Sequence, residues 1–251
     1  MRVVFLGRNH NVLSIACLTG LLECESLKVL VGIDRFLRSG IAKTAARGLR
    51  LYGTSRFVRR ALVLAVTMLL PGGLYQAHGA SLQEVARRKG VSWFECADVN
   101  GPDELQTIST FSPDLIVVAN FGQILRRDVL SIPPKGCINV HPSMLPKYRG
   151  PLPLYWALEN KETMTGVSVH YMDEGIDSGD IILQRSFDIA RWDTEGSLRK
   201  KAADHSVPLL HETIELISRG VAPRIPQENV NATYFSYPRL KGRHLSIGVG
   251  L

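Results

Sequence analysis

The sequence has few cysteines, and none of them are paired at a metal-binding or redox spacing. Its four cysteines, Cys17, Cys24, Cys96 and Cys137, are scattered along the chain without a C-x-x-C motif. This spacing argues against a zinc site and against a thiol-disulfide motif. We therefore expect small buried hydrophobic residues in a reducing compartment, and no bound metal.

The sequence also lacks the features of a secreted or membrane-spanning chain. Its start, MRVVFLGRNHN, is typical of a strand and a turn, without the basic region and apolar core of a signal peptide. A nearly unbroken apolar run from Ala61 to Leu70 is shorter than the roughly 20 residues that cross a bilayer. We therefore expect a cytoplasmic protein.

Acidic residues are missing between Asp34 and Glu84, and this segment explains the net charge of +7. Its basic residues are Arg35, Arg38, Lys43, Arg47, Arg50, Arg56, Arg59 and Arg60. We expect a basic helical insertion at about 35–80 that packs on the domain or in a homodimer interface, with its arginines solvated or bound to an anionic substrate. Peripheral membrane contact through 35–76 is the alternative, because a basic face beside an apolar one suits anionic headgroups.

Two common motifs are absent as well. No G-x-G-x-x-G follows the first predicted strand, so nothing indicates NAD. No G-x-S-x-G surrounds Ser143, so the sequence offers no activated serine nucleophile.

The pattern that is present predicts an α/β fold. A buried strand at 3–6 leads to a helix capped by Asn11, and apolar strands then alternate with helices. We expect strands at 27–33, 91–95, 114–119, 136–140, 165–173, 181–189 and 233–236, and helices at 81–88, 102–110, 151–160 and 194–218. The fold class is therefore a Rossmann-like, doubly wound and mostly parallel sheet. We expect a catalytic domain over 1–220, with the insertion, and a short C-terminal extension over 221–251.

Three polar residues are the candidate catalytic groups. Strand alternation directs Asn139 and His141 to one face just before Pro142 ends the strand, and a glycine-rich turn carries Asp177. The carboxylate can orient the imidazole, the imidazole can transfer a proton, and the amide can donate to an oxyanion. This set suits acyl-type transfer without a covalent nucleophile. The alternative is a strand-end histidine and an aspartate that bonds its own turn.

The motifs around these residues resemble a known family. NVHPSMLPKYRG followed by MDEGIDSGDII resembles the formyltransferases that use 10-formyltetrahydrofolate, which include methionyl-tRNA formyltransferase, glycinamide ribonucleotide transformylase and the sugar-nucleotide N-formyltransferases. The resemblance covers 1–7 loosely and 81–220 well. It implies that Asn139, His141 and Asp177 are catalytic, that 10-formyltetrahydrofolate donates the formyl group, and that no metal is needed.

The resemblance also implies where the donor's pteridine ring binds. The residues that it assigns to this ring are Gln123, Ile124, Leu125, Asp173, Glu174, Gly175 and Ile176. Core packing is the alternative for Ile124 or Leu125. Lys147 and Arg149, in the loop after His141, could bind a phosphate or carboxylate of the acceptor, or simply be solvated. Of the other histidines, we expect a structural role for His170 and surface positions for His205 and His211.

The acceptor is less constrained by the sequence. An amino-sugar nucleotide is the first expectation, since the basic segment suits a diphosphate and only about thirty residues follow Gly220. Methionyl-tRNA and glycinamide ribonucleotide remain alternatives, although GRNHN replaces the glycine-rich phosphate loop of the glycinamide ribonucleotide enzymes. Hydrolysis of the donor by water and a non-catalytic folate- or membrane-binding protein are further alternatives.

Overall fold

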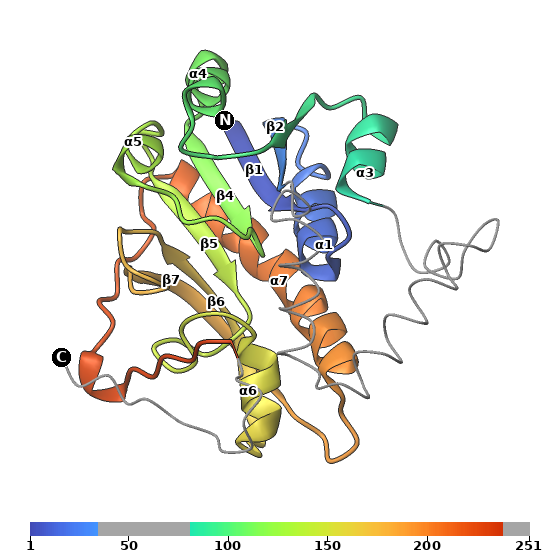
Figure 1. Ribbon diagram of the computed structural model, residues 1–251, viewed down its shortest axis with the longest axis vertical. Helices are drawn as coiled ribbons and strands as arrows, with labels where there is room; N and C mark the ends of the chain where they lie inside the picture. Colours follow the sequence, from blue (N-terminus) through green and yellow to red (C-terminus); the bar gives the residue numbers. More distant parts are fainter. Residues whose placement is uncertain (35–80, 238–251) are drawn as a thin grey trace.

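A seven-stranded sheet forms the centre of the computed structural model, which describes residues 1–34 and 81–237 (Figure 1). Its strand order is β3-β2-β1-β4-β5-β6-β7. The strands are β1 (Arg2–Arg8), β2 (Lys28–Asp34), β3 (Trp93–Cys96), β4 (Leu115–Ala119), β5 (Cys137–His141), β6 (Met164–Tyr171) and β7 (Ile181–Asp188). The first five strands are parallel, while β6 and β7 pair antiparallel. The predicted mostly parallel, Rossmann-like sheet is confirmed, with an antiparallel hairpin at one edge.

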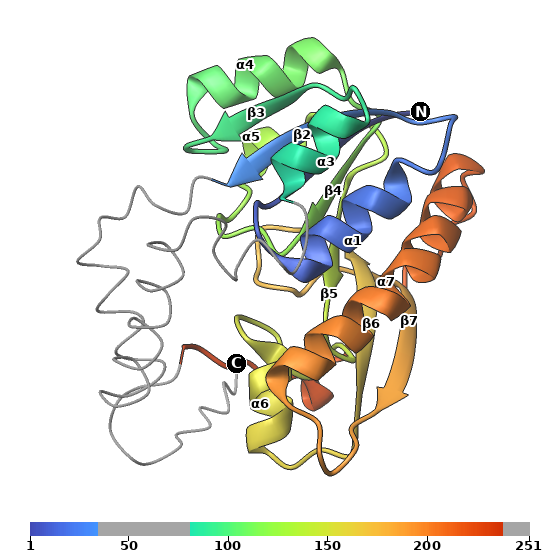
Figure 2. The same cartoon turned by 90° about the vertical axis from the view of Figure 1, so that its right-hand side faces the viewer.

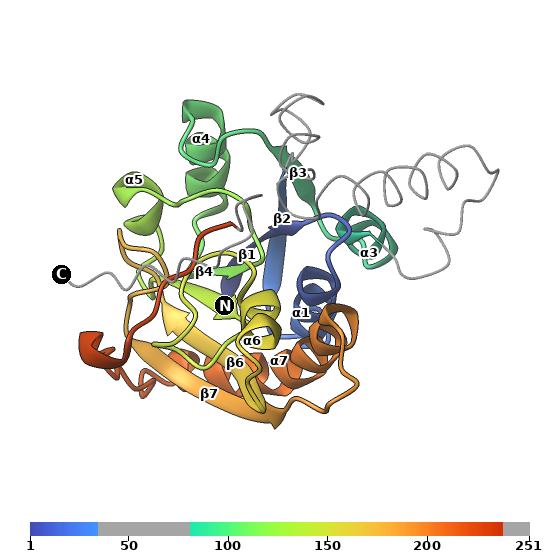
Figure 3. The same cartoon turned by 60° about the horizontal axis from the view of Figure 1, so that its bottom comes forward.

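Helices cover both faces of this sheet. They are α1 (Val12–Leu21), α3 (Leu82–Arg88), α4 (Pro102–Phe111), α5 (Arg127–Leu130), α6 (Pro153–Glu159) and α7 (Glu195–Ser218), followed by the 3-10 turn η3 (Asn229–Asn231). Figure 2 shows α1 and α7 side by side, where His211 bonds the carbonyl of Gly20 at 2.8 Å. Helices α4 and α5 lie on the opposite face (Figure 3). Within 1–34 and 81–237, no helix is long and apolar enough to cross a bilayer.

The alternation of each strand produces two hydrophobic cores. In β1, Val3 and Phe5 join the core beneath α1, α3 and α7, while Val4 and Leu6 join the core beneath α4 and α5. All four side chains are fully buried. Burying a side chain of this size contributes about 1.5–3 kcal/mol. Apolar residues on both faces of one strand are the reason why the sequence pattern indicates a central parallel strand.

Side chains fix the helix starts where the sequence predicts them. Asn11 Oδ1 accepts from Ser14 N at 3.0 Å, and Ser81 Oγ accepts from Glu84 N at 3.0 Å. These bonds satisfy amides that have no partner within their own helix. Thr194 caps α7, which includes Pro208.

Three local predictions need correction. The capping box expected at Glu84 is incomplete, because its carboxylate pairs with Arg87 and Arg88 instead. The strand expected at 233–236 is reduced to an isolated bridge between Tyr234 and Arg149. His211 bonds Gly20, as described above, and His205 stacks on Phe187 with 5.0 Å between the ring centroids, so neither is a plain surface residue. The predicted basic helical insertion and its membrane contact lie outside the described residues.

The four cysteines are free, as their spacing predicts, and they should differ in reactivity. Cys17, Cys96 and Cys137 are buried, and burial raises the pKa of each thiol to about 12. Cys24 is only half-buried. Because the thiolate is the reactive form, we expect a thiol reagent to label Cys24 at least about 10-fold faster than the others in the folded protein. Peptide mapping after timed labelling measures this, and fast labelling of Cys137 would contradict it.

Candidate active site

A cavity of about 1180 Å³ opens at the carboxyl ends of β1, β4 and β5. From β1 the chain runs outward to β2 and β3, while β4 and β5 lie on its other side, so the strand order reverses between β1 and β4. Open α/β sheets bind ligands at such a reversal. The turn after β1, the loop after β4 and the turn between β6 and β7 all line the cavity. The topology therefore places a ligand site where the sequence predicts the catalytic residues.

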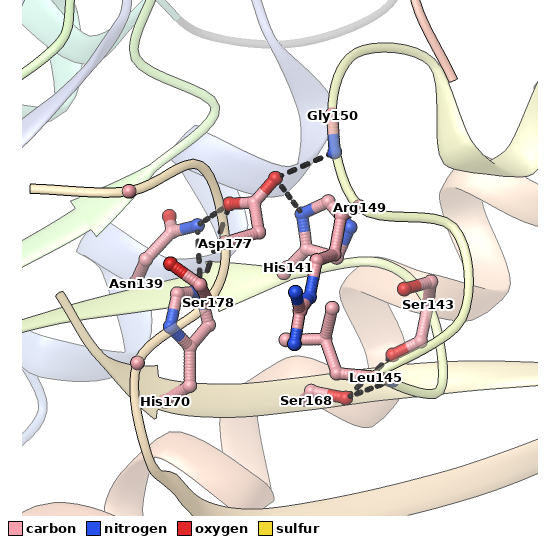
Figure 4. A network of polar contacts seen from close by, with 12 residues as sticks. Asn139, His141, Ser143, Leu145, Arg149, Gly150, Ser168, His170, Asp177 and Ser178 are labelled. Carbon is pink, nitrogen blue, oxygen red and sulfur yellow. Dashed lines mark hydrogen bonds and ion pairs between the residues drawn. The ribbon is translucent and has the colours of Figure 1, made fainter. Parts of the chain in front are cut away.

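The three predicted catalytic side chains meet in this cavity (Figure 4). Asn139 Nδ2 donates to Asp177 Oδ1 at 3.2 Å. Asp177 Oδ2 accepts from the Gly150 amide at 2.8 Å and faces His141 Nδ1 at 3.6 Å. One carboxylate thus links the amide to the imidazole, although 38 positions separate Asn139 from Asp177 in the sequence.

The imidazole of His141 is held at one nitrogen. Its Nε2 lies 2.9 Å from the carbonyl oxygen of Tyr148, which can only accept, so Nε2 carries a hydrogen. Its Nδ1, at 3.6 Å from Asp177, is too far for a good hydrogen bond and remains available to a substrate or water. This geometry suits a group that takes up and delivers a proton at Nδ1.

Burial and neighbouring charge act in opposite directions on Asp177. Burial raises the pKa of this carboxyl, but the charge of His141, the contact with His170 and the Gly150 amide together outweigh it. The pKa of Asp177 therefore lies well below its usual value, and the group stays ionised at neutral pH. A fixed negative charge therefore lies beside the His141 imidazole.

A fourth polar residue, His170, belongs to the same network. It is the cross-strand partner of Asn139 and is 2% exposed. Its Nδ1 lies 2.7 Å from the carbonyl of Tyr171, so Nδ1 carries the hydrogen and Nε2 accepts from Asn139 Nδ2 at 3.2 Å. The structural role expected for His170 did not include this contact with Asn139. A histidine inside a strand of otherwise uncharged residues was the signal that could have indicated it.

Strained backbone also gathers around the cavity. Asn120, Leu152 and Asp177 have positive φ angles of 49°, 60° and 51° and line it, and Tyr148, which bonds His141, has φ 61°. Each such non-glycine residue costs about 1–3 kcal/mol, and strain of this kind is common at functional sites.

The predicted donor-binding residues have different environments. Ile124 and Ile176 line the cavity with 63% and 45% of their surface exposed, which suits contact with a flat apolar ring. Leu125 also lines the cavity, but it is 1% exposed and belongs to a hydrophobic core, so its alternative interpretation as a core residue is supported too. The side chain of Gln123 donates to Asp34 at 3.0 Å and accepts from Val99 N at 2.7 Å. Gln123 therefore anchors its loop rather than pointing freely at a ligand.

The predicted donor-binding residues in the turn between β6 and β7 also differ in their positions. Asp173 and Gly175 line the cavity, whereas Glu174 is exposed and is not among the described lining residues. Lys147 is exposed on the loop after His141, and Arg149 donates to Gln227 Oε1 from Nε at 3.0 Å and from Nη2 at 2.8 Å. The cavity lining in the described part of the chain includes neither of these two basic residues.

The fold and the site together define a Rossmann-like domain with an Asn-His-Asp cluster at the reversal of its sheet. A sequence model of the formyl transferase family matches residues 74–214. The chain belongs to this family.

Individual relatives and solved structures agree with that assignment. Methionyl-tRNA formyltransferase of Desulforamulus reducens is 48% identical over 139 residues, which span 55% of this chain and 43% of that protein. The chain spans about half the length of the curated relatives that it matches. Glycinamide ribonucleotide transformylase 1 of Symbiobacterium toebii has a similar structure, with a TM-score of 0.63, 22% identity, and coverage of 90% of this chain and 93% of that one. An N-formyltransferase of Helicobacter canadensis, in complex with folinic acid and dTDP-3-aminofucose, gives a TM-score of 0.63 at 20% identity, with coverage of 94% and 71%.

Proposed function

We propose that this chain transfers a formyl group from 10-formyltetrahydrofolate to a primary amine. The observation that carries the proposal is the single carboxylate of Asp177, which contacts Asn139 and faces His141 inside one cavity. Family membership and the folinic acid complex of the Helicobacter canadensis protein support a reduced folate as the donor. The exposed Ile124 and Ile176 offer apolar surface for its ring.

The family resemblance implies a role for each of the three residues, and their geometry supports it. The amine nitrogen forms a bond to the formyl carbon, whose oxygen becomes an oxyanion. His141 Nδ1–H and the Asn139 amide donate to that oxygen, and the Asn139 bond to His170 has to lengthen for this. Asp177 holds both donors, and water beside its carboxylate carries the amine's proton toward the folate nitrogen. As the intermediate collapses, the bond between the formyl carbon and the folate nitrogen breaks, and that nitrogen takes up the proton.

Two acceptors have support. The 48% identity to a methionyl-tRNA formyltransferase favours methionyl-tRNA. An amino-sugar nucleotide, the first expectation from the sequence, is supported by the similar structure bound to dTDP-3-aminofucose, which at 20% identity shows the fold alone. Lys147 and Arg149 stay predictions as acceptor contacts. The homodimer and the cytoplasmic location also stay predictions.

The test is spectroscopic detection of tetrahydrofolate from 10-formyltetrahydrofolate with separate amines. We would supply methionyl-tRNA, an amino-sugar nucleotide, glycinamide ribonucleotide or no amine, and compare wild type with His141→Ala. His205→Ala is the matched control, since its ring stacks on Phe187 away from the cavity lining. We expect turnover that requires one amine, survives in His205→Ala and falls by at least about 10²-fold in His141→Ala. Turnover without an amine would identify a hydrolase, and its absence with every amine would refute the proposal.

A further inference from the structure

A segment that follows α7 closes over the active-site loop, and we call residues 225–237 the C-terminal strap (Figure 1, red). At its start, Ile225 exchanges two backbone hydrogen bonds with Ile181 of β7, at 2.8 and 3.0 Å. Near its end, Arg149 N donates to Thr233 O at 2.9 Å and Phe235 N donates to Arg149 O at 3.0 Å. The strap is therefore fastened to the sheet and to the loop that follows His141.

One side chain of the strap, Gln227, joins the backbone of the Asp177 turn to the side chain of Arg149. Its Nε2 donates to the carbonyls of Asp177 and Gly179 at 2.9 and 2.7 Å, and its Oε1 accepts the two bonds from Arg149 described above. The amide thus uses both hydrogens and both lone pairs. The opposite amide orientation would place its oxygen against two carbonyl oxygens, so the contacts fix the assignment.

The contacts of Gln227 lie next to both partners of the hydrogen bond between the Gly150 amide and the Asp177 carboxylate. Gly150, whose amide donates to Asp177 Oδ2, directly follows Arg149. Asp177 itself has a left-handed backbone, with φ 51°, which surrounding contacts must maintain. Gln227 ties the carbonyl of Asp177 to the side chain of Arg149 and so sets the distance that the Gly150 bond spans.

The strap also holds the imidazole side of the centre. Thr233 Oγ1 accepts from Tyr148 N at 2.8 Å, and the carbonyl of Tyr148 bonds His141 Nε2. Phe235 stacks on the ring of Tyr148 with 5.2 Å between centroids. Both partners of the His141–Asp177 contact are therefore fixed by the same 13-residue strap, one through Thr233 and one through Gln227.

We propose that Gln227 and Thr233 are positioning residues for formyl transfer. They hold Asp177 and His141 in their places relative to one another, although neither Gln227 nor Thr233 lines the cavity. The proposal rests on the proposed function for its kinetic consequence, but not for its structural one. Misplacing a catalytic group by about 1 Å can cost about 10²-fold in rate. A purely structural strap would instead alter stability and leave the rate of the folded protein unchanged.

The test on the Asp177 side uses Gln227→Glu in the full chain. Glutamate keeps the acceptor for Arg149 and replaces the amide donor by an oxygen that faces two carbonyls. We expect kcat to fall by about 10²-fold, with KM for 10-formyltetrahydrofolate within about twofold because the donor's contacts are unchanged. Gln106→Glu, on the exposed surface of α4, is the matched control for the added charge and should match wild type.

The test on the His141 side uses Thr233→Val, which keeps the shape of the side chain but removes the oxygen that accepts from Tyr148 N. Thr233→Ser restores that oxygen and should restore kcat. An unchanged kcat in both Gln227→Glu and Thr233→Val, with turnover present in wild type, would overturn the proposal.

A second measurement does not need turnover. Hydrogen exchange of the Gly150 amide and the ¹⁵N shifts of the His141 ring report the two contacts directly. We expect at least about 10-fold faster exchange at Gly150 in Gln227→Glu and moved ring shifts in Thr233→Val, while β1 and β4 amides keep their protection. Wild-type values at both positions, or an equal loss of protection throughout the sheet, would overturn the proposal. If no amine supports turnover, these spectra still decide whether Gln227 and Thr233 position Asp177 and His141.

Discussion

Replacing Asp177 by asparagine is expected to lower kcat for formyl transfer by about 10³-fold, because it removes the negative charge that contacts Asn139 and faces His141. The carboxylate accepts from the Gly150 amide and from Asn139, and it faces His141. An asparagine can offer only one oxygen, so its NH₂ group would oppose one of these donors. Steady-state rates with whichever amine supports turnover in the wild type measure the effect.

The matched control is Asp180→Asn, in the same turn. Asp180 pairs with Arg224 at 3.6 Å, and its side chain is 35% exposed, so losing this pair should cost less than about 1 kcal/mol and leave kcat unchanged. A rate for Asp177→Asn within about 10-fold of wild type would show that the carboxylate is not essential to the chemistry. Removing the charge of the aspartate in a Ser-His-Asp triad lowers kcat by far more than that.

Replacing Gly150 by alanine is expected to have the next largest effect, a loss of about 10²-fold in kcat. Gly150 has φ +93°, and an added Cβ would lie 2.5 Å from the carbonyl oxygen of Phe235 and 2.8 Å from the ring of Tyr234. The positive φ alone costs alanine about 1–2 kcal/mol. The closer of the two contacts is with the backbone of the strap, so relief requires the strap or the Gly150 amide to move away from Asp177.

The control for backbone strain is Gly90→Ala. Gly90 has φ +66°, but nothing lies within 4 Å of the position of its added Cβ. We therefore expect a similar strain cost in urea unfolding without a change in kcat. Equal kinetic effects of the two substitutions would mean that crowding against the strap has no part in the loss at Gly150.

The sequence predicts the sheet well because its signals are local. Val3, Phe5, Val4 and Leu6 are apolar on both faces of one strand, which indicates a buried parallel strand before any partner is known. Asn11 and Ser81 lie at their helix starts because capping needs only the next three residues. The antiparallel pairing of β6 with β7 follows from the short turn that joins them.

The site is predicted in part, for a related reason. Asn139 and His141 emerge from strand alternation, and Asp177 from its resemblance to a family motif, and the structure brings all three together. The side-chain partners of Gln123 and Arg149 lie 89 and 78 positions away, so no local pattern could show that both are already bonded. Ile124 and Leu125 are adjacent and equally apolar, and only tertiary packing distinguishes the exposed residue from the buried one.

The position of the strap in the chain has a consequence for synthesis. Gln227 contacts the carbonyl of Asp177 across 50 positions, and Thr233 contacts Tyr148 across 85. A chain folds from its N-terminal end as it leaves the ribosome, at about 5–20 residues per second. The residues of the sheet and of α7 therefore leave the ribosome before those of the strap, and a nascent chain that ends at Ser218 has Asn139, His141 and Asp177 but not the strap contacts to Tyr148 and Arg149. We therefore expect the proposed site to be completed only once residues 225–237 have been synthesised.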